Sequence, residues 1–112
     1  MRNAKSILTR SEEILLLSIL RLRDEAYGAT ILQEVRAGTG KEMRIGALWV
    51  ELDILAKKGF VVKRLADPTP QRGGRAKIYY KLTAEGLKAL LDTRDVQEAL
   101  WRGIPEMLKD YR

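Results

Sequence analysis

The sequence predicts a mainly α-helical fold with a small β-hairpin, and two observations lead to this prediction. Apolar residues recur at three- and four-residue steps in three stretches before residue 58 and again after residue 83, as they do along one side of an α-helix. Between these stretches, residues 60–65 and 77–82 are β-branched and aromatic runs that flank a segment rich in proline and glycine. That arrangement is typical of two strands joined by a long loop. At 112 residues, the chain has the length of one domain with one modest core.

The first helix is expected to run from Ser11 to about Arg23. Thr9 and Glu12 have the spacing of a capping box, in which each side chain accepts a hydrogen bond from the backbone amide of the other residue. The helix has almost no polar face, because seven of its residues are apolar: Ile14, Leu15, Leu16, Leu17, Ile19, Leu20 and Leu22. The core of so small a domain covers only one side of a helix. We therefore expect a second chain to cover the apolar residues on the other side.

A short second helix, from Ala29 to about Ala37, is expected to end at the turn formed by residues 38–40. The third helix carries four apolar residues at helical spacing on one side: Ile45, Leu48, Leu52 and Leu55. Gly59 follows its last turn and can adopt the left-handed conformation that ends a helix. The third helix therefore spans about residues 45–58. Two short helices joined by a glycine-containing turn form a helix-turn-helix.

The last part of the chain, residues 83–112, predicts a helical region that Thr83 caps at its start. It has two apolar stripes, first Leu87, Leu90 and Leu91, then Val96, Ala99, Leu100, Ile104, Met107, Leu108 and Tyr111. At about 100° per residue, the second stripe is rotated from the first by roughly 140°. Either the helix bends near residues 92–95, or its first half packs on its own domain and its second half on another subunit. Pro105 is expected in the first turn of a short final helix.

The net charge of +6 is concentrated in one part of the chain. Residues 41–77 carry nine basic and four acidic side chains, whereas the residues before and after them are close to neutral. This distribution is expected of a surface that faces nucleic acid, and the alternative is a solvated basic face that keeps the protein in solution.

The chain has no cysteine and no histidine. This excludes disulfides, thiol nucleophiles, zinc sites built from thiolates or imidazoles, and the usual general base near neutral pH, so we expect neither an enzyme nor a metal or cofactor. No apolar run approaches the roughly 20 residues of a membrane helix, and the N-terminus does not have the pattern of a signal peptide. We therefore expect a cytoplasmic protein that is not in a membrane.

In order, the expected elements are three helices, a strand, a basic loop, a strand and a long helix. This is the architecture of a winged helix-turn-helix with a C-terminal dimerisation helix. We expect a DNA-binding domain at residues 1–82, with the recognition helix at about 45–58 and the wing at about 60–82. A C-terminal helical dimerisation region at residues 83–112 follows.

Three separated segments carry a resemblance to a known family. They are Tyr-Gly at 27–28, Gly-Ala-Leu-Trp-Val-Glu-Leu-Asp-Ile-Leu at 46–55 followed by Gly-Phe-Val at 59–61, and Arg-Ala-Lys-Ile-Tyr-Tyr-Lys-Leu-Thr-Ala-Glu-Gly at 75–86. In this order, they resemble the PadR family of transcriptional regulators over about residues 9–92. The third helix departs from the family pattern, because Ala47, Trp49 and Val50 stand where the family commonly has Thr or Ser, Tyr and Pro. Which of its side chains contact bases is therefore left open.

The resemblance implies a homodimeric DNA-binding repressor, and a homodimer suits a palindromic operator of double-stranded DNA. The third helix would enter the major groove and the wing would contact the backbone or the minor groove. The C-terminal helix would dimerise together with the first helix. Short members of the family sense planar hydrophobic compounds in a dimer-interface cavity lined by tryptophan, so the resemblance also implies a small hydrophobic effector. Trp101 lies in the matching helix, where a buried interface tryptophan without a ligand is the alternative.

The candidate site residues follow from these patterns. The candidates for DNA contact are Arg44, Lys41, Arg72, Arg75, Lys77, Tyr27, Gly46 and Ala47. The candidates for the dimer interface or effector pocket are Trp101, Leu16, Leu20, Val96 and Leu100. Gly46 and Ala47 have no bulk, so a phosphate can approach the backbone amides at the start of the third helix. Arginine on a wing suits a bidentate phosphate contact or a narrow minor groove. A protein-interaction adaptor that has a winged fold without DNA readout is the alternative function.

Overall fold

The computed structural model describes residues 5–66 and 77–111. Its elements in chain order are α1 (Arg10–Leu22), η1 (Arg23–Glu25), α2 (Gly28–Thr39), α3 (Ile45–Lys57), β1 (Val61–Leu65), β2 (Ile78–Leu82), α4 (Ala84–Trp101), α5 (Ile104–Leu108) and η3 (Lys109–Tyr111). The predicted fold class, mainly helical with one hairpin and a C-terminal helix, is confirmed. None of the helices in the described ranges is long and apolar enough to cross a membrane.

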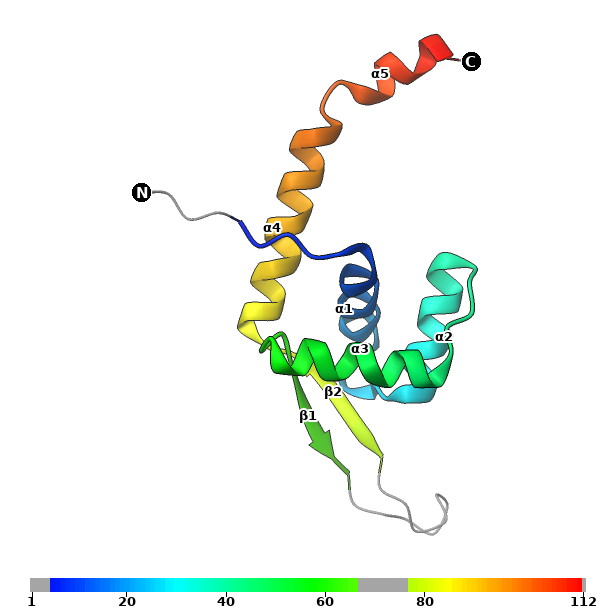
Figure 1. Cartoon of the computed structure of the whole chain (residues 1–112), viewed down its shortest axis with the longest axis vertical. Coiled ribbons are helices and arrows are strands. Elements are labelled where there is room, and N and C mark those ends of the chain that lie inside the picture. Colours follow the sequence, from blue (N-terminus) through cyan, green and yellow to red (C-terminus); the bar gives the residue numbers. More distant parts are fainter. Residues whose placement is uncertain (1–4, 67–76, 112) are drawn as a thin grey trace.

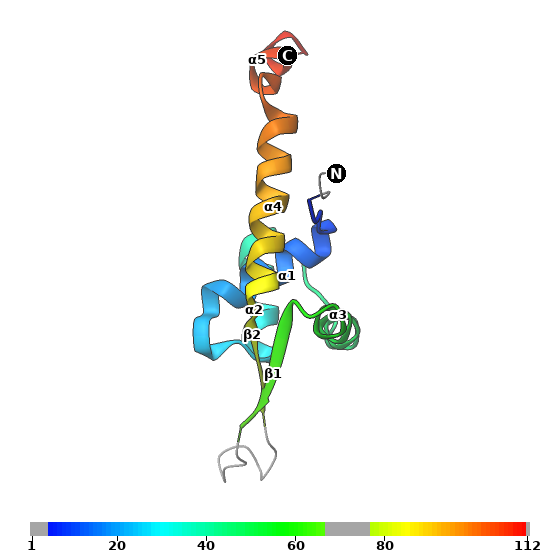
Figure 2. The same ribbon diagram turned by 90° about the vertical axis from the view of Figure 1, so that its left-hand side faces the viewer.

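The core forms where α1, α2, α3, the hairpin and the first half of α4 meet (Figure 1). β1 and β2 pair antiparallel, with Val61 opposite Leu82 and Leu65 opposite Ile78. In Figure 2, α3 lies on one side of the hairpin, and η1 and α2 lie on the other. The buried apolar residues are Leu8, Leu15, Leu16, Ile19, Ala26, Ile31, Val35, Leu48, Leu52, Leu55, Val61, Tyr80, Ala89 and Leu90. The buried side chains of α3 are three of the four that its spacing predicts.

The helix ends follow from local side-chain and backbone chemistry. The predicted capping box is present, because the Glu12 amide donates to Thr9 Oγ1 over 3.1 Å and the Thr9 amide donates to Glu12 Oε1 over 3.0 Å. Gly59 has a φ of +81°, which a glycine adopts without steric cost, and it ends α3 as predicted. Thr83 caps α4 by accepting a hydrogen bond from the Gly86 amide. Pro105 lies in the first turn of α5, as predicted.

Small residues determine which face of α4 packs on the core. α4 is one uninterrupted helix, and its buried residues are Gly86, Ala89, Leu90 and Thr93. A Cβ at residue 86 would overlap the Phe60 carbonyl oxygen, so only glycine permits this approach of α4 to the start of β1. Of the first apolar stripe, only Leu90 is therefore buried, whereas Leu87 and Leu91 are exposed. Close backbone approach, and not side-chain size, selects the buried face.

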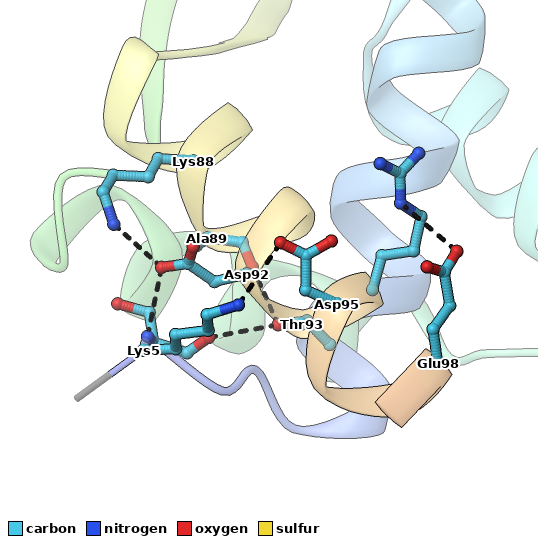
Figure 3. A network of polar contacts seen from close by, with 9 residues as sticks. Lys5, Lys88, Ala89, Asp92, Thr93, Asp95 and Glu98 are labelled. Carbon is cyan, nitrogen blue, oxygen red and sulfur yellow. Dashed lines mark hydrogen bonds and ion pairs between the residues drawn. The ribbon is translucent and has the colours of Figure 1, made fainter. Parts of the chain in front are cut away.

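The segment before α1 is tied to α4 by polar contacts (Figure 3). Thr93, which is fully buried, accepts a hydrogen bond from the Leu8 amide over 3.0 Å and donates to the Ala89 carbonyl over 2.8 Å. The Ser6 amide donates to Asp92, and Lys5 forms an ion pair with Asp95. Apart from the bond to Ala89, these contacts join residues more than 80 positions apart and hold the first half of α4 against the segment before α1.

The second half of α4 extends away from the other helices and carries α5 at its far end (Figures 1 and 2). The molecule is therefore elongated, with extents of 59, 42 and 21 Å. Leu100 and Trp101 are exposed in this part of the chain, as are Met107, Leu108 and Tyr111 beyond it. Of the two alternatives that the stripes left open, the first half of α4 does pack on its own domain, and α4 continues as one helix through residues 92–95. Contact of its second half with another subunit stays a prediction.

Candidate nucleic-acid interface

The start of α3 is exposed and positively charged. Arg44 occupies the N-cap position with an extended backbone (φ −77°, ψ 143°), and its side chain makes no capping hydrogen bond. The first amides of α3 have no acceptors within the helix, so they point outward at the positive end of the helix dipole. Gly46 and Ala47 in this first turn are exposed, and the space around a Cβ at residue 46 is open. Such a helix start accommodates a phosphate group.

Lys41 lies in the link that leads to this helix start. Gly40, with a φ of +74°, ends α2, and the Lys41 amide then donates to Thr39 Oγ1 over 3.1 Å. The side chains of Lys41 and Arg44 are exposed, and neither forms an ion pair with another residue in the described ranges. Glu42, between them, is instead paired with Arg36 of α2 over 3.3 Å. The local carboxylate is therefore neutralised, and two cations remain available beside the amides of α3.

The other end of α3 carries a charge cluster that the sequence did not predict. Asp53 forms two ion pairs: Oδ2 lies 3.0 Å from Lys57 Nζ, and Oδ1 lies 3.7 Å from Nζ of Lys63 in β1. The hydrogen bond and the positive charge of Lys57, with a smaller contribution from Lys63, lower the pKa of Asp53. This carboxylate is therefore charged at neutral pH, and the three side chains together carry one net positive charge. The pairing of Asp53 with Lys57 has i,i+4 helical spacing, but the contact with Lys63 depends on how the hairpin packs.

The loop end of the hairpin holds two cations on aromatic rings. The rings of Tyr27 and Tyr79 meet edge to face, with centroids 5.3 Å apart. Lys77 Nζ lies 4.0 Å from the centroid of Tyr27, and Arg64 Cζ lies 4.7 Å from the centroid of Tyr79. Cation–π contacts of this kind favour a fixed position of the charge. Lys77 and Tyr27, both candidates from the sequence, are thus in contact with each other.

Trp49 packs between α2 and the hairpin. A Cβ built at Gly28 would lie 3.2 Å from Trp49 Cη2, and the indole centroid lies 6.5 Å from that of Tyr80. The ring is nevertheless partly exposed. Through these contacts, Trp49 packs α3 against α2 and the hairpin.

The candidates for DNA contact fall into three places. Arg44, Gly46 and Ala47 lie at the start of α3 and Lys41 lies three residues before Arg44, whereas Lys77 and Tyr27 meet at the loop end of the hairpin. Arg72 and Arg75 lie outside the described residues. Lys57, Lys63 and Arg64 were not among the candidates, and the sequence signal for Lys57 was its i,i+4 spacing from Asp53.

One candidate for the dimer interface or effector pocket requires correction. Leu16 has an exposed fraction of 0%, because it faces the core of its own chain, so its side chain is not available to a second chain. Leu20 is exposed and lines a hollow of about 310 Å³ with Ile19, Leu82, Leu87 and the charged residues Arg23, Asp24 and Lys81. Val96 is partly buried, whereas Leu100 and Trp101 are exposed on the projecting half of α4.

Comparisons with known proteins agree with this geometry. The model of the transcriptional regulator PadR-like family matches residues 16–92. No curated protein sequence gives a significant match. A solved PadR family transcription regulator from Clostridium difficile R20291 is 26% identical, with a TM-score of 0.60 over 89% of this chain and 96% of that chain. The complex structure of hsRosR-S1 is 26% identical, with a TM-score of 0.67 over 92% of this chain and 90% of that chain. The putative transcriptional regulator TA0346 from Thermoplasma acidophilum shares the fold, at 23% identity and a TM-score of 0.68 over 91% of this chain and 97% of that chain.

The matched residues run from within α1 to the middle of α4. They include α2, α3 and the hairpin, and thus the start of α3 and the cations at the loop end of the hairpin. Proteins of this family are regulators of transcription and not enzymes. The chain belongs to the PadR-like family of transcriptional regulators.

Proposed function

We propose that this DNA-binding transcription regulator is a homodimeric repressor that acts in the cytoplasm on a palindromic operator. In this proposal, α3 enters the major groove and the wing contacts the adjacent backbone or minor groove. The observation that carries the proposal is the exposed start of α3, where Arg44 and Lys41 stand beside helix amides that have no acceptor within the helix. A phosphate would complete the hydrogen bonding of these amides.

Each DNA-contact residue has a distinct role in the proposal. Arg44 and Lys41 contact phosphates, which positions α3 without reading sequence. Gly46 and Ala47 allow the backbone of α3 to come close to the DNA. Lys77, held on Tyr27, contributes a cation where the strands of the wing meet its loop. Arg72 and Arg75 are proposed to contact DNA from the loop between the strands.

The dimer is supported by apolar side chains that the single chain leaves exposed on α1 and α4. They are Leu17, Leu20, Leu87, Leu91, Leu100 and Trp101. We propose that residues 83–112 form the main dimerisation region and that α1 contributes to it, since a monomer would leave all of this apolar surface in water. A small hydrophobic effector would bind at this interface beside Trp101, while a purely structural role of Trp101 in the dimer is the alternative.

A protein-interaction adaptor is the second candidate function, and one observation favours it. The outward side of α3 carries the exposed aliphatic residues Val50 and Ile54, which a protein partner can cover. Charge reversal at Arg72 and Arg75 separates the two functions. Lost promoter binding supports the repressor, whereas unchanged promoter binding together with loss of a protein partner supports the adaptor.

The salt dependence of promoter binding tests the role of Arg44. Each phosphate contact contributes about 0.9 to the slope of log K against log salt concentration, because it releases condensed counterions. Arg44→Ala is expected to lower affinity and to reduce the slope by about 1. Arg102→Ala, which removes an exposed arginine beyond the end of α4, is the matched control and is expected to change neither. Equal slopes for both variants would contradict a phosphate contact at Arg44. A reporter gene behind the bound promoter then distinguishes repression from activation.

A further inference from the structure

The outward face of α3 is aliphatic. Leu48 and Leu52 have exposed fractions of 0%, and Val50 lies two residues, or about 200°, from each of them. Val50 is accordingly 60% exposed, and Ile54, which follows it by four residues, is 42% exposed. With Ala47, three residues before Val50, they form a continuous stripe on the side of the helix opposite the core.

This face has little capacity for hydrogen bonds to bases. α3 contains no Arg, Asn, Gln, Ser or Thr, which are the side chains that most often read guanine and adenine. Its charged side chains are Glu51, Asp53 and Lys57, and its remaining side-chain donor is the indole N–H of Trp49, whose ring packs on Gly28 and Tyr80. Asp53 and Lys57 are paired with each other, and Glu51 is half-buried beside Met43 in the hollow between α1 and α3. α3 therefore has almost no side chain that is available to read bases by hydrogen bonds.

The charges around the stripe match a polyanion. Arg44 and Lys41 lie at one end of α3, and Lys57 and Lys63 lie at the other. Together with Asp53, the two lysines carry a net charge of +1. An aliphatic stripe framed by cations fits the major groove of DNA, whose floor offers one apolar group, the C5-methyl of thymine. The flanking cations would hold the stripe against the base edges by contacting the two backbones.

We propose that α3 selects its operator by apolar contact of Val50 and Ile54 with thymine methyl groups. Ala47 leaves room for the approach of the helix. The inference rests on the proposed function, because it assigns the sequence readout of the same DNA interface. The half-site is then defined by thymines at the positions under Val50 and Ile54, and phosphate contacts supply most of the affinity.

Replacement of thymine by deoxyuridine tests the proposal, because it removes the methyl group and keeps all the hydrogen-bonding groups. An operator is first obtained by selection of bound DNA from a random pool with the wild-type protein. Its thymines are then replaced one at a time, and the Kd of the full-length protein is measured at a fixed salt concentration. We expect one to three positions per half-site at which deoxyuridine weakens binding about fourfold, the factor that corresponds to burial of one methyl-sized group.

Variants assign the effect to the side chains. In Val50→Ala, the penalty of deoxyuridine is expected to disappear at one position, and in Ile54→Ala at another. Both residues are exposed, so the melting temperatures of these variants are expected to match that of the wild type. Ile7→Ala is the matched control, because Ile7 is an exposed aliphatic residue outside α3 and the wing, and it is expected to retain every penalty.

Two outcomes would overturn the proposal, and they are distinguishable. If a specific operator is bound and deoxyuridine has no effect at any position, the readout by methyl groups is wrong, while the proposed function stands. If no sequence is enriched from the pool, the proposed function fails and this inference with it. Unchanged operator affinity in Val50→Asp would likewise overturn the inference and assign the stripe to a protein partner.

Discussion

The indole ring of Trp49 in α3 lies on Gly28, the first residue of α2. A Cβ built at residue 28 would be 3.2 Å from Trp49 Cη2 and 3.3 Å from Trp49 Cζ2, which is closer than ordinary van der Waals contact. The absence of a side chain at residue 28 therefore allows the two helices of the helix-turn-helix to pack with a tryptophan between them. The orientation of α3 relative to α2 depends on this contact.

Gly28→Ala is expected to lower the free energy of unfolding by about 1 kcal/mol, because the indole ring must shift to admit a methyl group. In a Trp49→Leu background, the same substitution is expected to cost nothing, and a double-mutant cycle measured by urea denaturation gives the coupling. Gly38→Ala is the matched control, because Gly38 lies in the same helix with no atom within 4 Å of its built Cβ. This control is expected to be neutral or to stabilise by up to about 1 kcal/mol. A Gly28→Ala variant as stable as the Gly38→Ala variant would contradict the described contact.

Gly86→Ala is expected to be more damaging, with a loss of about 3 kcal/mol, because the added Cβ overlaps a backbone carbonyl that cannot rotate away. α4 would have to move off the start of β1, which also weakens the contacts of Ala89 and Thr93 behind it. The melting temperature checks this expectation. A wild-type melting temperature for Gly86→Ala would mean that α4 packs by another face.

The contact between Glu12 and Lys58 predicts a pH dependence of stability. Burial tends to raise the pKa of Glu12, but hydrogen bonds from the Lys58 ammonium group and the Thr9 amide outweigh it, so that the pKa falls below the ordinary value of 4.5. Because the folded pKa is the lower one, the charged carboxylate stabilises the fold above pH 4.5, and this stability is lost as the pH falls through the folded value.

Glu12→Gln is therefore expected to be less stable by about 1 kcal/mol at pH 7 and to lose less stability between about pH 5 and pH 3. Urea denaturation of both proteins across this range is the measurement. Glu85→Gln, in the first turn of α4, is the control for loss of a carboxylate near a helix start. If the curves for wild type and Glu12→Gln remain parallel down to pH 3, the contact does not contribute to stability.

Asp53→Asn is expected to strengthen DNA binding about fivefold, because it removes a negative charge from the face proposed to meet the DNA. It also releases Lys57 and Lys63 from their ion pairs, so the salt dependence is expected to become steeper by about 1. Fluorescence anisotropy over a series of salt concentrations measures both quantities. Asp110→Asn, which removes an exposed carboxylate near the end of the chain, is the control. Weaker binding by Asp53→Asn would instead indicate that the carboxylate itself contacts a base.

The parts of the fold that depend on local chemistry could be predicted from the sequence. The capping box at Thr9 and Glu12 and the end of α3 at Gly59 follow from residues within a few positions of each other, and the hairpin follows from two β-branched and aromatic runs that are consecutive along the chain. The buried face of α4 could not be predicted, because apolar periodicity identifies Leu87 and Leu91, whereas the close approach of Gly86 to Phe60 buries a different face.

In the candidate site too, the features that depend on local sequence could be predicted, and those that depend on packing could not. The exposed helix start at Arg44 could be predicted, since it needs only a helix boundary and a cation. The neutralisation of Asp53 by Lys63 and the cation of Lys77 on Tyr27 could not, because each joins two elements whose packing is decided by the whole core. The burial of Leu16 is another consequence of packing, because a helix that is apolar all round does not indicate which of its sides faces its own core.

Selection of bound DNA from a random pool tests the central claim most directly. A homodimer that inserts α3 into the major groove is expected to enrich a palindrome whose half-sites are separated by about one helical turn, or about 10 base pairs, or by a multiple of it. The mass of the complex is expected to correspond to two chains per operator. Enrichment of no sequence, or of an asymmetric sequence bound by a single chain, would contradict the account.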